Sequence, residues 1–127
     1  MSAKRSVLLV DDDPDLRTIG ELSLTSVGGF DVRCAPSGAD ALAMVRADRP
    51  DVVLLDLMMP GLDGPATLAQ LKQDPATKDI PVIFLSAKIE ADQLERYREL
   101  GAEGIIPKPF DPMTLPDEVR RIVRGLD

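Results

Sequence analysis

Short apolar runs recur along the chain, and each is followed by a longer stretch in which apolar residues return at helical spacing. A continuous apolar run of about four to eight residues is typical of a strand that is buried on both faces, as in a parallel sheet covered by helices. The predicted strands are 7–10, 30–35, 51–56, 82–85 and 104–106.

The stretches between these runs predict helices at 13–27, 37–49, 63–74, 90–100 and 115–126. Side-chain oxygens that can cap a helix N-terminus precede the first three, and Gly28-Gly29 stops the first. In the last helix Pro116 would clash within a helix begun at Pro112, so we expect the start near Leu115 with Thr114 as the cap. The fourth helix is the weakest, because only Leu94, Tyr97 and Leu100 are clearly apolar.

The alternation of strand and helix predicts an α/β fold, a doubly wound parallel sheet with helices on both faces. A chain of 127 residues is long enough for one domain with a sizeable core, and we expect a single domain, 1–127, without an output domain. No run approaches the roughly 20 apolar residues of a membrane helix, and the N-terminus lacks an apolar signal segment. Cytoplasmic residence is therefore the expectation.

Composition narrows the available chemistry. The net charge of −7 disfavours direct binding to nucleic acid phosphates. The absence of histidine excludes His-based catalysis and His metal ligands, which leaves carboxylates, hydroxyls and lysine. The single cysteine, Cys34, excludes an internal disulfide, and its place in a predicted strand indicates a small buried hydrophobe.

Polar residues follow the predicted strands where the chain leaves each of them: Asp11, Asp12 and Asp13, then Asp56, Ser86 and Lys108. Parallel strands end at one edge of a sheet, where ligands of such folds bind. Each residue alone has a structural explanation: Asp13 as the cap before Pro14, Ser86 as a helix cap, Lys108 as a surface lysine. Together they form a cluster of carboxylates, one hydroxyl and one ammonium group.

Two carboxylates about 4 Å apart repel by roughly 4 kcal/mol at an effective dielectric near 20, so such a cluster needs a cation or a raised pKa. Lys108 supplies one positive charge, and its flanking prolines restrict the backbone, with Lys108-Pro109 a candidate cis bond. Oxygen ligands without His or Cys favour Mg²⁺, or Mn²⁺. The set suits a phosphoryl group on Asp56, with the metal and Lys108 on its oxygens and Ser86 as a hydrogen-bond donor.

With these residues in place, the chain strongly resembles the receiver domain of bacterial two-component response regulators. Matching blocks occur in order and at the right spacing over nearly the whole chain: Val10 to Pro14, Asp56 to Gly64, Ser86-Ala87, and Lys108-Pro109-Phe110. The resemblance implies a flavodoxin-like fold with strand order 2-1-3-4-5. It also implies Mg²⁺-dependent transfer of a phosphoryl group to Asp56 from the phosphohistidine of a sensor histidine kinase or a histidine phosphotransfer protein, and a switch in binding to a downstream protein target.

The resemblance assigns roles to individual residues. Asp12 and Asp56 would bind Mg²⁺ directly together with the backbone carbonyl of Met58, while Asp11 would act through water. Lys108 would pair with the phosphoryl oxygens, and Ser86, followed by Ala87, would form the phosphoryl-binding switch. The protein would be a regulatory phosphoacceptor that catalyses only its own phosphorylation and dephosphorylation.

Three further positions bear on the output and on the lifetime of the phosphoryl group. Ile105 stands where relatives usually carry the aromatic residue of the switch, so we expect a weaker or different coupling between Ser86 and the surface around the fourth helix. Met58 and Lys88 flank the phosphoacceptor at positions that influence attack by water. Met58 offers no hydrogen bond to a water and Lys88 can shield the phosphoryl group, so we expect slow self-dephosphorylation.

Two other functions are compatible with a receiver-like chain. A phosphatase with an aspartate nucleophile generally needs a second acid two residues further on, where this chain has Met58. A receiver-like protein interaction domain that works without phosphorylation is the main alternative. The intact set of acidic residues argues against it, and Ile105 argues for it.

Overall fold

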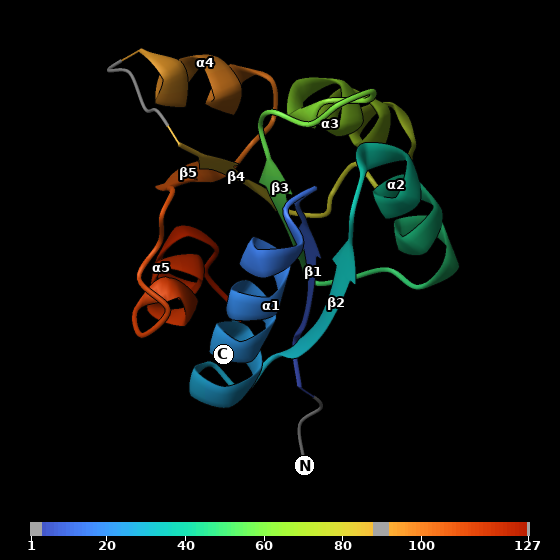
Figure 1. Cartoon of the computed structure of the whole chain (residues 1–127). Helices are drawn as coiled ribbons and strands as arrows, with labels where there is room; N and C mark the ends of the chain where they lie inside the picture. The colour runs from blue at the N-terminus through green and yellow to red at the C-terminus, as the bar shows by residue number, and fades with distance from the viewer. Residues whose placement is uncertain (1–3, 88–91, 127) are drawn as a thin grey trace.

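The computed structural model describes residues 4–87 and 92–126 and has a central five-stranded sheet (Figure 1). All pairs of neighbouring strands are parallel, in the order β2-β1-β3-β4-β5. The strands are β1 Ser6–Val10, β2 Asp31–Ala35, β3 Val52–Asp56, β4 Val82–Ser86 and β5 Gly104–Pro107. The predicted fold class and strand order are therefore confirmed.

Helices connect successive strands and cover both faces of the sheet (Figure 1). They are α1 Pro14–Leu22, continued by a π-helical segment η1 Ser23–Val27, then α2 Gly38–Ala47, α3 Gly64–Gln73, α4 Gln93–Glu99 and α5 Leu115–Ile122. No helix among the described residues is long and apolar enough to cross a membrane.

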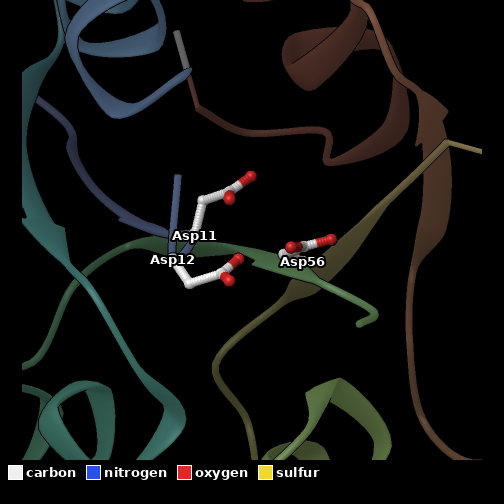
Figure 2. A group of neighbouring side chains, drawn as sticks. All are labelled: Asp11, Asp12 and Asp56. Carbon is white, nitrogen blue, oxygen red and sulfur yellow. The ribbon is translucent and has the colours of Figure 1, made fainter. Parts of the chain in front are cut away.

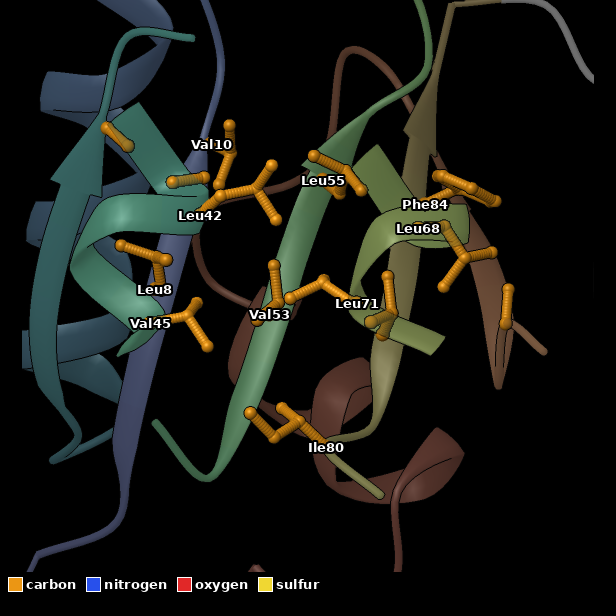
Figure 3. Close-up of a cluster of buried hydrophobic side chains, with 14 of the residues drawn as sticks. Leu8, Val10, Leu42, Val45, Val53, Leu55, Leu68, Leu71, Ile80 and Phe84 are labelled. Atoms are coloured by element: carbon orange, nitrogen blue, oxygen red, sulfur yellow. The ribbon is translucent and has the colours of Figure 1, made fainter. Parts of the chain in front are cut away.

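Two apolar cores lie on opposite faces of the sheet, because alternate residues of a strand point to opposite sides. The first core joins Leu8, Val53 and Phe84 to side chains of α2 and α3 (Figure 3). The second joins the intervening strand residues, among them Leu9 and Leu54, to η1 and α5. Every residue of β3 and β4 is buried, as expected for central strands covered on both faces.

The predicted caps fix where three helices begin. Asp13 Oδ1 accepts from the backbone N–H of Asp15 at 3.0 Å, and Asp63 Oδ1 accepts from that of Ala66 at 2.9 Å. Ser37 caps α2 in the same way, through the N–H of Asp40 at 3.1 Å. Each bond satisfies a backbone donor that has no partner within its helix.

Thr114 does not cap α5 with its side chain, so that prediction was wrong. The helix does begin at Leu115, but the turn before it is built on Asp111. The Asp111 carbonyl accepts from the N–H of Leu115 at 2.9 Å, and its carboxylate accepts from the N–H of Met113 at 2.9 Å. An Asx turn therefore replaces the hydroxyl cap.

Cys34 is only half-buried, in contrast to the buried position predicted for it. It lies on β2, an edge strand, so fewer neighbours cover its side chain. Its thiol donates to a carboxylate oxygen of Glu21 at 3.9 Å. Burial and the Glu21 charge raise the pKa of Cys34 to about 11.

Candidate functional site

Three backbone hydrogen bonds continue the sheet ladder at its carboxyl edge and hold the candidate residues together. The N–H of Asp11 donates to the Ala35 carbonyl at 3.1 Å, and the N–H of Leu57 donates to the Leu85 carbonyl at 3.0 Å. The N–H of Lys108 donates to the Ser86 carbonyl at 2.8 Å. Since backbone bonds of the sheet fix these positions, the site is built directly on the strand ends.

Three carboxylates converge at this edge, as Figure 2 shows. One oxygen from each of Asp11, Asp12 and Asp56 lies within 4.8 Å of the others. Asp11 and Asp56 are buried, with 0% and 4% of their surface exposed, whereas Asp12 is exposed. The sequence-predicted cluster is therefore assembled as expected.

Lys108 joins two of these carboxylates. Its Nζ lies 3.0 Å from Asp11 Oδ2 and 3.2 Å from Asp56 Oδ1. The peptide bond between Lys108 and Pro109 is cis, as predicted. With three carboxylates and one ammonium group, the cluster retains a net charge of about −2 when all its groups are ionised.

Backbone donors occupy other carboxylate oxygens. The N–H of Asp13 donates to Asp11 Oδ1 at 2.9 Å, so both oxygens of Asp11 have a protein partner. The N–H of Met58 lies 3.4 Å from Asp56 Oδ1, a long and weak contact. Asp56 is therefore held less tightly than Asp11.

The electrostatic environment perturbs two groups. Burial, followed by the charge of Asp11, raises the pKa of Asp56, and Lys108 offsets only part of this effect. Burial lowers the pKa of Lys108, but its hydrogen bond to Asp11 and the charges of both carboxylates outweigh burial, so that the pKa lies above its usual value. Lys108 is thus a fixed cation beside a comparatively basic carboxylate.

A cavity of about 620 Å³ opens above the cluster. Its lining brings together the candidates from all the strand ends and includes Ser86 and Ala87 beside Asp56 and Lys108. Ser86 is buried, whereas the Met58 side chain is 83% exposed at the cavity rim. Lys88 lies outside the described residues.

Sequence reasoning missed two contributors from α4 to the cavity. Gln93 and Tyr97, one helical turn apart, contribute to its lining. The sequence pattern assigns Tyr97 only to a weak apolar stripe. Its spacing of four residues from Gln93 is the signal that places both on one face of the helix. A third missed residue, Arg17, donates from Nη1 to the Asp11 carbonyl at 2.7 Å and so fixes the backbone of that residue.

Ile105 does not line the cavity. It is half-buried and packs against the first core, where it is the strand partner of Phe84. Its aliphatic side chain therefore fills the corner of the sheet beneath α4.

The donor set fits a hard divalent cation. Its ligands are all oxygens, and a 2+ ion would balance the residual charge of the cluster. Two oxygens bound directly to one Mg²⁺ lie at most about 4.2 Å apart, given bonds of about 2.1 Å. The observed limit of 4.8 Å is close to this value, so a small side-chain rotation or one intervening water would complete the fit.

Comparison with known proteins identifies the family. The model of the response regulator receiver domain matches residues 7–120, nearly the whole chain. The chain therefore belongs to the receiver domains of response regulators, the regulatory phosphorelay modules of two-component signalling.

Relatives with known names support this assignment. The transcriptional regulatory protein CseB of Streptomyces coelicolor is 40% identical, over 98% of this chain and 51% of that protein. The probable transcriptional regulator ycf27 of Porphyridium aerugineum is 37% identical, over 98% of this chain and 50% of that protein. The chain thus spans about half the length of the curated relatives it matches.

Solved structures show the same fold. The chemotaxis protein CheY4 of Vibrio cholerae superposes with a TM-score of 0.88 at 29% identity, covering 95% of this chain and 100% of that one. A response regulator from Chloroflexus aurantiacus, described as putative, has a TM-score of 0.86 at 33% identity, covering 94% of this chain and 98% of that one.

Proposed function

We propose that residues 1–127 act as one receiver unit in which Asp56 accepts a phosphoryl group. The observation that carries this proposal is the placement of Asp56 at the end of a buried strand, 3.2 Å from Lys108 and within reach of two further carboxylates. The raised pKa of Asp56 makes its carboxylate a better nucleophile once ionised, and Lys108 offers a fixed positive charge for the incoming phosphoryl oxygens.

The chemical step is a displacement at phosphorus. An Asp56 carboxylate oxygen forms the new P–O bond while the P–N bond of the donor phosphohistidine breaks, and the imidazole nitrogen retains the electron pair and takes up a proton. Because residues 1–127 contain no histidine, the donor histidine lies outside this receiver unit. We infer a sensor histidine kinase or a histidine phosphotransfer protein as the donor.

We further infer a Mg²⁺ site, in which Mn²⁺ could substitute. Asp12 and Asp56 would be its direct protein ligands together with the Met58 carbonyl. Asp11, whose two oxygens are already engaged by Lys108 and the Asp13 N–H, would act through a water. When bound, the ion would neutralise charge on the phosphoryl oxygens.

Other residues recognise the phosphoryl group and set its lifetime. Ser86, with the adjoining Ala87, lies on the same cavity as Asp56 and donates a hydrogen bond to the phosphoryl oxygens. The Met58 side chain is apolar and 83% exposed beside the acceptor, so it cannot orient an attacking water. This position favours slow self-dephosphorylation, with Lys88 as the second tuning residue.

A small phosphodonor tests the proposal without the unknown kinase. Incubation with acetyl phosphate and Mg²⁺ should add one phosphoryl group, and peptide mapping should place it on Asp56. Asp56→Asn should abolish labelling, while Asp31→Asn, which removes an exposed carboxylate on β2, should leave it unchanged. Failure to label the wild-type chain at saturating Mg²⁺ would favour an interaction domain that works without phosphorylation.

A further inference from the structure

Helix α4 is weakly attached to the rest of the domain. It spans only Gln93–Glu99, and none of its residues is fully buried. Among the described elements its main packing partner is β5, whereas α2 and α3 bury several residues each in the first core. A helix with so little buried surface can shift its position at low cost.

Tyr97 is the α4 side chain that connects this helix to the interior. It is half-buried and packs against the first core. Its ring meets that of Phe84 edge to face, with the centroids 5.0 Å apart and the planes at 67°. This geometry is a favourable one for aromatic pairs.

The same side chain borders the phosphoryl site. Tyr97 and Gln93 line the cavity that contains Asp56, Ser86 and Lys108. Phe84, the ring on which Tyr97 packs, precedes Ser86 by two residues in β4, so the two side chains share a face of the strand. On β5, the strand partner of Phe84 is Ile105. This aliphatic residue packs against the core without lining the cavity.

We propose that Tyr97 transmits occupancy of the phosphoryl site to helix α4. The inference rests on the proposed function, since it requires a group to occupy the cavity at Asp56. A phosphoryl group on Asp56, together with the Ser86 hydroxyl that binds it, would occupy part of the cavity that the Tyr97 ring borders. Because Tyr97 is the inward side chain of a loosely held helix, its displacement moves α4. Tyr97 is thus a positioning residue for the output surface and takes no part in the chemistry.

The composition of the chain provides a direct probe. Tyr97 is the only tyrosine, and there is no tryptophan. Incorporating 3-fluorotyrosine therefore gives a single ¹⁹F resonance that reports on this ring. We expect Mg²⁺ with beryllofluoride, a phosphoryl mimic, to move the resonance by more than its linewidth. The mimic should leave it unmoved in Asp56→Asn.

Hydrogen exchange of the α4 amides tests whether the ring carries the coupling. In the wild type, the mimic should change the exchange rates of residues 93–99. Tyr97→Leu should reduce that change by about 3- to 10-fold, the factor expected for loss of one aromatic pair, while Tyr97→Phe should preserve it. Affinity for the mimic, followed through the melting temperature, should weaken in Tyr97→Leu by no more than the same factor, because coupling between two sites is reciprocal, and should be preserved in Tyr97→Phe.

Leu94→Ala is the matched control. Leu94 is a half-buried residue of the same helix, but it lines a separate groove with Arg98, Ile105 and Ile122. Its truncation should accelerate exchange throughout α4 while leaving the response to the mimic intact.

The outcomes distinguish the role of Tyr97 from the phosphoacceptor function of Asp56. A resonance that stays in place while the mimic binds, or a full α4 response in Tyr97→Leu, would overturn the role of Tyr97 and leave the phosphoacceptor proposal standing. Failure of the mimic to raise the melting temperature of the wild type would overturn the proposed function and this inference with it.

Discussion

Replacing Asp56 with asparagine should stabilise the metal-free protein. The substitution keeps the size of the side chain but removes a buried negative charge that faces Asp11 and Asp12. It also removes the attraction to Lys108, so the sign of the effect depends on which contribution is larger.

The distances decide this balance. At an effective dielectric near 20, the Lys108 contact at 3.2 Å is worth about 5 kcal/mol, and each repulsion, between oxygens no more than 4.8 Å apart, costs at least about 3.5 kcal/mol. The two repulsions exceed the attraction by about 2 kcal/mol, and solvent around the exposed Asp12 reduces this to about 1 kcal/mol. Desolvation of the buried carboxylate adds to the cost. We therefore expect a gain of about 1–2 kcal/mol for Asp56→Asn.

The pH dependence follows from the raised pKa of Asp56. Its protonated form favours the folded state, so this stabilisation is complete below the unfolded value of about 3.9 and is lost as the pH rises through the folded pKa. Asparagine stays neutral at every pH. The advantage of Asp56→Asn should be absent below about pH 4 and fully developed at neutral pH.

Thermal unfolding in EDTA measures the effect. A gain of about 1–2 kcal/mol corresponds to a rise in Tm of about 4–8 °C for a domain of this size. Asp31→Asn removes an equal charge from an exposed site and should change Tm by less than about 2 °C. An Asp56→Asn variant that melts at or below the wild-type temperature at pH 7 would refute the electrostatic argument.

Other predictions concern the site, the thiol and the core. Lys108→Ala should tighten Mg²⁺ binding by roughly tenfold in calorimetry, because it removes a positive charge that lies 3.0 Å from Asp11 and 3.2 Å from Asp56 and would repel a divalent ion held at the same cluster; unchanged affinity would place the ion away from Lys108. Iodoacetamide at pH 8 should modify Cys34 about 100-fold more slowly in the folded than in the urea-unfolded chain, because the folded pKa is about 11, and equal rates would contradict the shift. Leu54→Ala removes a side chain with 0% exposure and should cost about 3 kcal/mol in urea unfolding; a loss below about 1 kcal/mol would mean that the core collapses around the gap.

Sequence reasoning succeeded where the signal was local. The apolar run from Val52 to Leu55 identified a buried strand, and Asp63 identified the start of α3, because both depend on residues close by in the chain. The acidic cluster was predictable as well, since the ends of parallel strands share one edge.

Two of the three failures had non-local causes. Cys34 is half-buried because β2 lies at the edge of the sheet, a position that its own sequence does not encode. The role of Tyr97 at the cavity was missed because its aromatic partner, Phe84, belongs to another element. The turn before α5 uses Asp111 where Thr114 was expected, since both residues offer an oxygen at a plausible distance from the helix start.

The contact between Lys108 and Asp11 joins residues 97 positions apart in the chain. A ribosome must therefore deliver nearly the whole domain before the buried carboxylate of Asp11 meets its counter-ion. Until the segment that follows β5 docks, the acidic pocket lacks the ammonium group of Lys108. The proposed phosphoacceptor site is therefore complete only after the last strand has been synthesised and has docked.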